Sequence, residues 1–335
     1  NNFAGVIHMK KTIVAAAIAA VVAAPAAMAE LSVYGKAHID YTSGDSDTGI
    51  SENASRIGFK FSDDLGNGMN AFGKFEYGTF AMDGTNGSLN AQADLEAAAN
   101  LNAGDLAGVL GTNSARLFNR DAYVGLGGDF GKVMFGRMGA PTKGALYGLG
   151  NVQLGDSIVD FADGFRSKSS SSGYGRISNV AAYAGSFNGV NVTLAKAGAE
   201  GTDNMDSSAY GFDTTIAGIK VGAARTDVDG TGDATVIGAK MSMDALTVGI
   251  VREDVNPDGA DDYDTTGVSA SYKMGANTLA VSYSDRDTAA DVTRTNISLQ
   301  HALSKKTSVY IAHGQVETDG EDDVDNTAVG MIMSF

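Results

Sequence analysis

The chain has 335 residues, no Cys, no Trp and a formal net charge of −16. The absence of Cys excludes disulfides and thiolate metal sites. The acidic balance excludes an ordinary nucleic-acid partner, because phosphate binding needs clustered Lys and Arg.

The first 29 residues resemble a targeting segment rather than folded structure. Met9-Lys10-Lys11 is a short basic start, residues 12–24 are apolar but too short to cross a bilayer, and Ala27-Met28-Ala29 forms a small-x-small cleavage site. We therefore expect a secretory signal peptide over residues 9–29 and a mature chain beginning at Glu30. Residues 1–8 are expected to be a non-native upstream extension.

The segment 30–42 alternates between apolar and polar residues, which is typical of a strand with one apolar face and one face exposed to water. One face carries Leu31, Val33, Ala37, Ile39 and Tyr41. The other carries Ser32, Tyr34, Lys36, His38 and Asp40. We expect the polar face, including Lys36, His38 and Asp40, to line water.

Two kinds of connection alternate along the rest of the chain. Tight turns are expected at 63–68, 127–131, 186–189, 217–218, 244–245, 275–277 and 304–306. Longer acidic or Gly/Ser-rich loops are expected at 43–54, 81–115, 139–175, 199–207, 228–232, 255–263, 288–291 and 318–325. These fifteen connections predict sixteen strands in an up-and-down antiparallel meander.

A meander of this length is stable when it closes into a barrel, because closure removes both exposed edges. A hydropathy scan would miss such a protein, since only every second residue of a transmembrane strand must be apolar. The secretion signal and the strand number favour apolar side chains facing lipid outside and a water-filled lumen inside. The fold class predicted is all-β, a 16-stranded antiparallel transmembrane β-barrel over residues 30–335, with short periplasmic turns and long extracellular loops.

Two long loops break the pattern. Residues 89–110 are rich in Ala and Leu and are expected to form a short helix. Residues 139–175 form the longest loop, and a loop of this length usually has a function. In a wide barrel it can fold inward and narrow the channel.

Several segments together resemble the general diffusion porins of Gram-negative outer membranes. They are "VYGKAHIDY" (33–41), "SRIGFKFSDDLGNGMNAFGKFEYG" (55–78), "FNRDAYVGLGGDFGKVMFGR" (118–137) and "SLQHALSKKTSVYIAHGQVE" (298–317). The chain also ends in Phe335, as members of that family usually do, and the resemblance implies a role for it in membrane insertion.

The resemblance implies a homotrimer of sixteen-stranded barrels in which the third long loop folds into the lumen, where loop carboxylates face basic residues on the wall. The matching wall positions are Lys36, Arg56, Arg120 and Arg176, and strand parity adds Lys74. The loop offers Asp156, Asp160 and Asp163. Charges placed in this way let a pore select ions.

The function expected is passive diffusion of ions and small hydrophilic solutes across the outer membrane. The expected surroundings are outer-membrane lipid and lipopolysaccharide, and no cofactor or nucleic acid is expected. Without Lys10 and Lys11 of the expected signal peptide, the chain has 22 basic and 40 acidic residues, a net charge of about −18. Because this charge is expected largely in loops at the pore mouth, a weak preference for cations is expected.

Other functions stay open at this point. A substrate-specific porin would need an aromatic ladder or a strongly basic pore, and an adhesive or structural surface barrel would need only the long loops. An enzyme would need a nucleophile paired with His38, His301 or His313, and no such partner is evident. Asp254, Asn256 and Asp258 match half of a calcium loop, but Thr265 replaces its final Glu, so only a weak metal candidate results.

Overall fold

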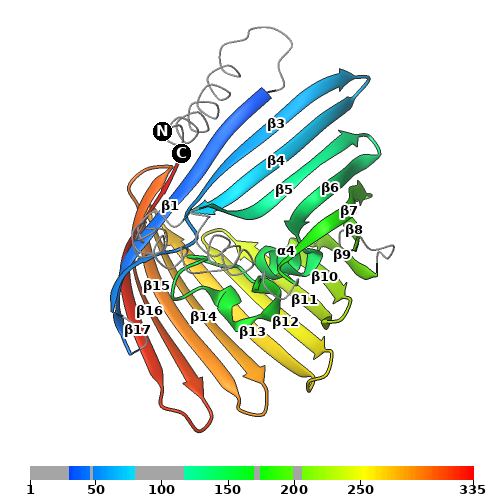
Figure 1. Ribbon diagram of the computed structural model, residues 1–335. Helices are drawn as coiled ribbons and strands as arrows, with labels where there is room; N and C mark the ends of the chain where they lie inside the picture. Colours follow the sequence, from blue (N-terminus) through cyan, green and yellow to red (C-terminus); the bar gives the residue numbers. More distant parts are fainter. Residues whose placement is uncertain (1–29, 46–47, 80–116, 170–173, 199–205) are drawn as a thin grey trace, which may run out of the picture.

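The computed structural model describes residues 30–335 except 46–47, 80–116, 170–173 and 199–205. One antiparallel sheet curls into a ring, and a helix lies inside it (Figure 1). The elements in chain order are β1 (Glu30–Gly44), β2 (Gly49–Glu52), β3 (Arg56–Gly66), β4 (Met69–Thr79), β5 (Leu117–Gly128), β6 (Gly131–Gly139), α4 (Pro141–Leu149), two 3₁₀ turns η1 (Phe161–Gly164) and η2 (Arg166–Lys168), β7 (Arg176–Phe187), β8 (Val190–Ala197), β9 (Ser207–Ile216), β10 (Ile219–Val228), β11 (Gly232–Met243), β12 (Leu246–Pro257), β13 (Tyr263–Met274), β14 (Asn277–Asp287), β15 (Val292–Ala302), β16 (Thr307–Thr318) and β17 (Val324–Ser334).

The ring closes where the last strand pairs with the first. β17 runs antiparallel to β1, with Lys36 opposite Ser334 and Gly44 opposite Asn326. β2 and β3 pair with successive parts of β1, so they are two halves of one strand, interrupted at residues 53–55. The seventeen segments therefore occupy sixteen positions. The predicted 16-stranded closed barrel is confirmed.

All seven predicted tight turns join consecutive antiparallel strands. Asn67-Gly68, Asn188-Gly189 and Ala217-Gly218 each have two consecutive residues with positive φ. Such turns match the right-handed twist of the strands they join, and glycine adopts this conformation without steric cost. The longer connections that are described in full outside the inward loop, at 229–231, 258–262, 288–291 and 319–323, lie at the opposite rim.

The two faces of the wall differ as the alternation predicts. Val329, Met331 and Met333 on β17 are 57%, 49% and 48% exposed, whereas Ala328 is fully buried against Leu154 and Val159 of the inner loop. The apolar residues therefore point outward, where a bilayer covers them. Among the described residues, no helix has the length and hydropathy needed to cross a membrane.

The loop between β6 and β7 folds into the lumen, as predicted. α4 packs against β9 to β12, and η1 packs against β13 to β15. Leu146, Leu149, Phe161 and Phe165 of the loop form an apolar cluster with Val236 and Val251 on the inner wall. This packing gives the barrel an internal core on one side. The helix predicted at 89–110 and the segment 1–29 lie outside the described residues.

The expectation that His38 and Asp40 line water is wrong. Both point inward, but they are only 0% and 2% exposed, because Leu154 and Val159 of the loop cover the neighbouring Tyr310. Tyr310 Oη donates to Asp40 Oδ2 over 2.6 Å and lies 2.8 Å from His38 Nε2. This polar network belongs to the packed side of the lumen.

Candidate functional site

The predicted basic residues gather on the inner wall opposite the packed loop. They come from β1, β3, β4 and β5, which are neighbours in the sheet, and from β7, which is separated from β5 by β6. Lys36 stands directly across from Arg56 in the β1–β3 pair, so the two cations share one face. The five residues predicted for this wall are Lys36, Arg56, Lys74, Arg120 and Arg176, and each forms an ion pair.

Three of these cations are held by two carboxylates on the wall itself. Glu76 lies 2.7 Å from Arg120 Nε and 3.2 Å from Lys74 Nζ. Asp121 lies 2.6 Å from Lys74 Nζ and 2.8 Å from Arg176 Nε. Tyr34 Oη also donates to Glu76 over 2.8 Å. We call Lys74, Glu76, Arg120, Asp121 and Arg176 the wall network.

A break in the strand register makes the wall network possible. In a regular strand the adjacent residues Arg120 and Asp121 would point to opposite faces. The β4–β5 register shifts between Phe75 and Tyr77, so both residues lie opposite Glu76, as at a β-bulge. Both side chains therefore reach inward. Neither Glu76 nor Asp121 was predicted from the sequence, although Glu76 shares the strand parity of Lys74.

Asp156 is the loop carboxylate that reaches the wall. Its Oδ2 lies 3.1 Å from Lys36 Nζ and 3.7 Å from Arg56 Nη1. Burial opposes ionisation of Asp156, but the charges of Lys36 and Arg56 outweigh it and lower the pKa of this carboxyl. Asp156 has a positive φ of 70°, a conformation that Asp tolerates better than most residues. Through Asp156, the loop crosses from the packed side to the basic wall.

The expectation that Asp160 faces the pore is wrong. It is 1% exposed, and it organises the loop from within. Its carboxylate accepts hydrogen bonds from the backbone N–H groups of Ala162 and Asp156, over 2.9 and 2.8 Å, and pairs with Lys168 at 2.8 Å. Asp160 therefore fixes the turn that carries Asp156.

Asp163 also pairs with Lys168, within the loop rather than across the lumen. Burial raises the pKa of Asp163 against the opposing charge of Lys168. Burial would lower the pKa of Lys168, but Asp160 and Asp163 raise it above the ordinary value. Asp160 and Asp163 thus share Lys168 as a partner within the loop, and the structure brings neither of them to the wall network.

Lys143 on α4 is a cation of this region that sequence analysis missed. Its Nζ donates to the Lys168 carbonyl over 2.9 Å and lies 5.6 Å from the centroid of the Tyr147 ring. Burial and the charges of Arg176 and Arg120 lower its pKa to about 8. The sequence offered no signal for it beyond its place in the longest loop.

The loop is fastened to the inner wall by buried polar contacts. Glu253 on β12 is fully buried and accepts the backbone N–H groups of Arg166 and Ser167, over 2.6 and 2.8 Å. Asn151 donates to the Thr247 carbonyl and to Ser271 Oγ, both over 3.2 Å. These contacts hold the loop to β12 and β13 on the side away from the wall network.

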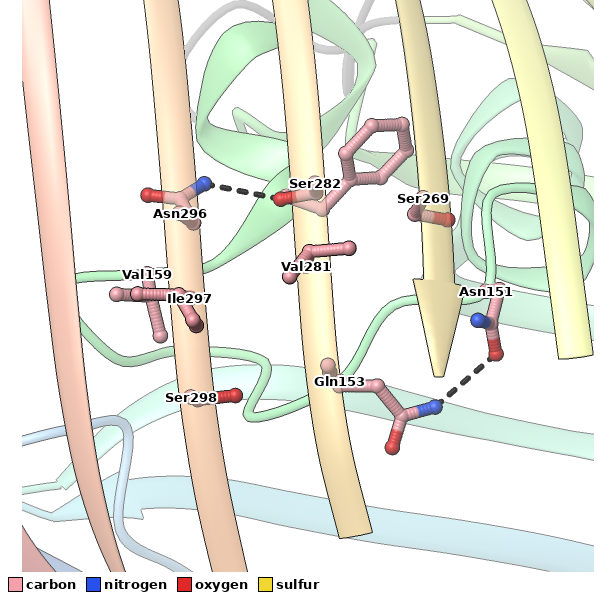
Figure 2. A pocket seen from close by; sticks show the side chains of 11 residues that line it. Asn151, Gln153, Val159, Ser269, Val281, Ser282, Asn296, Ile297 and Ser298 are labelled. Atoms are coloured by element: carbon pink, nitrogen blue, oxygen red, sulfur yellow. Dashed lines mark hydrogen bonds between the residues drawn. The ribbon is translucent and has the colours of Figure 1, made fainter. Parts of the chain in front are cut away.

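A small polar crevice remains between the loop and β13–β15 (Figure 2). The figure shows Asn151 and Gln153 of the loop facing a wall that carries Ser269, Ser282, Asn296 and Ser298. Asn296 donates to Ser282 over 3.1 Å, and Gln153 donates to Asn151 over 3.0 Å. The side chains thus satisfy one another, so the crevice is a polar seam beneath the loop.

The weak calcium candidate does not form a loop. Asp254 and Asn256 lie within β12, where Asp254 pairs with Arg252 at 3.0 Å and Asn256 donates to Asp233 over 2.9 Å. Asp258 follows the end of that strand. Within the described part of the chain, no three His, Asp or Glu residues gather in a way that could hold a metal ion.

Phe335 lies beside β1 at the rim where the barrel closes. Its backbone exchanges two hydrogen bonds with Gly35, over 3.1 and 3.2 Å. The ring covers Gly35 so closely that a Cβ there would collide with it, and the ring is 54% exposed. The terminal aromatic residue therefore lies on the outer surface, at the seam between the first and last strands.

Comparisons with known proteins agree with this architecture. A family model described as Gram-negative porin matches residues 15–321. The major outer membrane protein P.IB of Neisseria meningitidis serogroup B is 26% identical over 363 residues, covering 96% of this chain and 98% of that protein.

Two solved structures show the same fold. The anion-selective porin from Comamonas acidovorans has a TM-score of 0.71 at 19% identity, with 92% of this chain and 100% of that one covered. A trimer form of OmpT from Vibrio cholerae has a TM-score of 0.61 at 14% identity, with 92% and 100% covered.

Proposed function

We propose, from the premise that this chain belongs to the Gram-negative porin family, that its channel narrows between the inward loop and the wall network. The protein is an outer-membrane porin, which forms a water-filled channel for the passive diffusion of small hydrophilic solutes and is not an enzyme. What remains to be assigned is where solutes are selected, and by which charges.

One observation carries the proposed location. The described part of the loop packs against β9 to β17 through apolar contacts and buried hydrogen bonds, whereas its ion pairs with β1 and β3 join Asp156 to Lys36 and Arg56. Charged side chains are stable where water can reach them. The side chains of Arg56 and Asp156 are 23% and 22% exposed, so we place the aqueous path along this side of the lumen.

The local charges favour anions, in contrast to the expectation from net charge. Around the wall network and Asp156, the described cations outnumber the described carboxylates. The cations are Lys36, Arg56, Lys74, Arg120, Arg176 and Lys143, and the carboxylates are Glu76, Asp121 and Asp156. Charges at the narrowest point act on an ion at short range, whereas charges at the mouth are screened by salt. The Comamonas acidovorans structure is described as anion-selective, and these charges lead us to propose the same preference here.

We further propose that the protein works as a homotrimer embedded in outer-membrane lipid and lipopolysaccharide. OmpT of Vibrio cholerae has a form described as a trimer, and this chain shares its fold. Unheated detergent gels should then show a species of about three times the monomer mass. A single monomeric species by light scattering in mild detergent would count against this assembly.

Planar bilayer recordings of the purified protein test the function directly. We expect stepwise conductance and, under a KCl gradient, a reversal potential with the sign of anion preference. Absence of conductance would refute the proposal that the purified protein forms an open, water-filled channel. A clear cation preference at low salt would instead mean that the acidic loops at the mouth dominate the wall network.

A further inference from the structure

A buried chain of polar contacts crosses the seam where the barrel closes. Asp40 on β1 and Tyr310 on β16 both lie opposite Gly330 of the intervening strand β17. A Cβ at Gly330 would collide with the Tyr310 ring, so the glycine lets this ring reach across β17 to β1. The Tyr310 hydroxyl thereby meets both Asp40 and His38, and all three side chains are buried.

The directions of these hydrogen bonds fix where His38 carries its proton. The Asp40 carboxylate accepts from Tyr310 Oη over 2.6 Å and from Asn53 Nδ2 over 2.7 Å. Because Tyr310 has one hydroxyl proton, its oxygen can only accept from His38 Nε2, which lies 2.8 Å away. Lys36 Nζ lies 3.4 Å from His38 Nδ1, and an ammonium group can only donate. His38 therefore has its proton on Nε2 and a lone pair on Nδ1.

Lys36 joins this chain of hydrogen bonds to the inward loop. Its Nζ donates to Asp156 Oδ2 over 3.1 Å as well as to His38 Nδ1, so two acceptors set the direction of the side chain. The backbone of His38 is also held, since its N–H donates to Ser55 Oγ over 3.0 Å and its carbonyl accepts from the Asn53 N–H over 2.8 Å. Ser55 and Asn53 belong to the interruption between β2 and β3. The His38 ring is thus fixed at both nitrogens and through its backbone.

We propose that His38 is a positioning residue of the channel. Its unprotonated Nδ1 holds Lys36 in the orientation in which Lys36 meets Asp156, and its Nε2–H ties the ring to the closing seam through Tyr310. The seam and the tip of the inward loop are therefore one hydrogen-bonded unit. The consequence for conduction rests on the proposed function, since it requires the loop tip to border the aqueous path.

Two substitutions separate the two ring nitrogens. In His38→Asn, the side-chain oxygen can lie where Nδ1 was and accept from Lys36, but the side chain is too short to reach Tyr310. In His38→Gln, the amide N–H can lie where Nε2 was and donate to Tyr310, but no acceptor takes the place of Nδ1. A residue that only filled space would be replaced better by Gln, because Gln is closer to His in volume. The positioning role predicts the opposite order.

The readout is the occupancy of brief sub-conductance levels in planar bilayer recordings of the full-length protein. His38→Gln should raise the fraction of time spent at these levels by roughly tenfold, the order expected when a charged group loses one hydrogen bond. His38→Asn should stay close to the unmodified protein. The matched control is His301→Gln, which makes the same exchange at an exposed position of β15 and should have no effect.

The position of the proton is measured directly by solid-state NMR of the protein in lipid bilayers, with isotope-labelled histidine nitrogens. From Glu30 onward the chain contains three histidines, and His301→Gln and His313→Gln assign the signal of His38. At pH 7 we expect a proton on Nε2 of His38 and none on Nδ1. This measurement needs neither substitution at His38 to fold.

A proton on Nδ1 of His38 would overturn the inference. So would recordings in which the His38→Gln and His38→Asn channels behave alike, or in which His38→Gln is the milder change. In each of these cases the channel itself stands. If the unmodified protein does not conduct, the proposed function fails, and the NMR measurement still decides how His38 is bonded.

Discussion

Asp156 Oδ2 on the inward loop lies 3.1 Å from Lys36 Nζ on β1, and this contact joins residues that are 120 positions apart in the chain. Arg56 approaches the same carboxylate at 3.7 Å. The contact is made at the boundary between the packed side of the lumen and its charged side. Asp156 therefore does two things, since it holds the tip of the loop and offsets part of the positive charge of the wall.

Replacing Asp156 by Asn should separate these roles. Asn tolerates the positive φ of this position, so the turn is preserved while the charge is lost. We expect anion preference to rise by roughly twofold, for the loss of one charge at similar range, and open-channel current to become noisier. Reversal potential and current noise measure the two effects.

The control for this change is Asp129→Asn, which removes an exposed carboxylate in the tight turn between β5 and β6. It should have little effect on either quantity. If Asp156→Asn leaves both the reversal potential and the noise unchanged, Asp156 does not border the aqueous path.

Replacing Arg120 by Ala removes both a cation and a long side chain from the wall network. Glu76 keeps its contacts with Lys74 and Tyr34, so the barrel should stay folded. We expect higher single-channel conductance, because the opening widens, together with a shift toward cations. Single-channel recordings in a salt gradient measure both the conductance and the shift in ion selectivity.

Arg252→Ala provides the comparison, because Arg252 is exposed on β12 and pairs with Asp254 and Asp264 away from the wall network. It should alter neither conductance nor selectivity. Equal behaviour of the Arg120 and Arg252 variants would place the constriction elsewhere.

Replacing Glu253 by Gln should loosen the loop from β12. The buried carboxylate now accepts two backbone N–H groups, and an amide presents a donor to one of them. Leaving a buried donor without a partner costs about 1–3 kcal/mol. Trypsin should therefore cleave after Arg166 or Lys168 at least several times faster than in the unmodified protein.

Cleavage is followed by mass spectrometry of the detergent-solubilised protein. Glu317→Gln, on the exposed surface of β16, serves as the control and should cleave at the unmodified rate. An unchanged rate for Glu253→Gln would mean that the apolar cluster alone fastens the loop.

The border of the mature chain is tested separately. The basic start at Met9, the apolar run and Ala27-Met28-Ala29 predict cleavage before Glu30. N-terminal sequencing of protein extracted from outer membranes should begin at Glu30. Recovery of a chain that begins at Met9 would refute the signal peptide.

The sequence by itself determined the barrel. Alternation with a period of two is a local property of each strand, and the turns are local as well, so both can be read without knowing any neighbour. This is why the strand number, the tight turns, the outward apolar face and the inward parity of Lys36, Arg56 and Lys74 were all predictable. The length of residues 139–175 likewise indicated an inward loop.

Only the tertiary structure decided how the charges are paired. A register shift between β4 and β5 turns both Arg120 and Asp121 inward. The local alternation of apolar and polar residues does not predict such a shift. Loop packing buries Asp160 and presents Asp156 to Lys36 and Arg56. The net charge of −16 describes the whole surface, whereas the cations near the loop are brought together from strands far apart in the chain. The sign of the local field is therefore set by long-range contacts, which composition and periodicity do not contain.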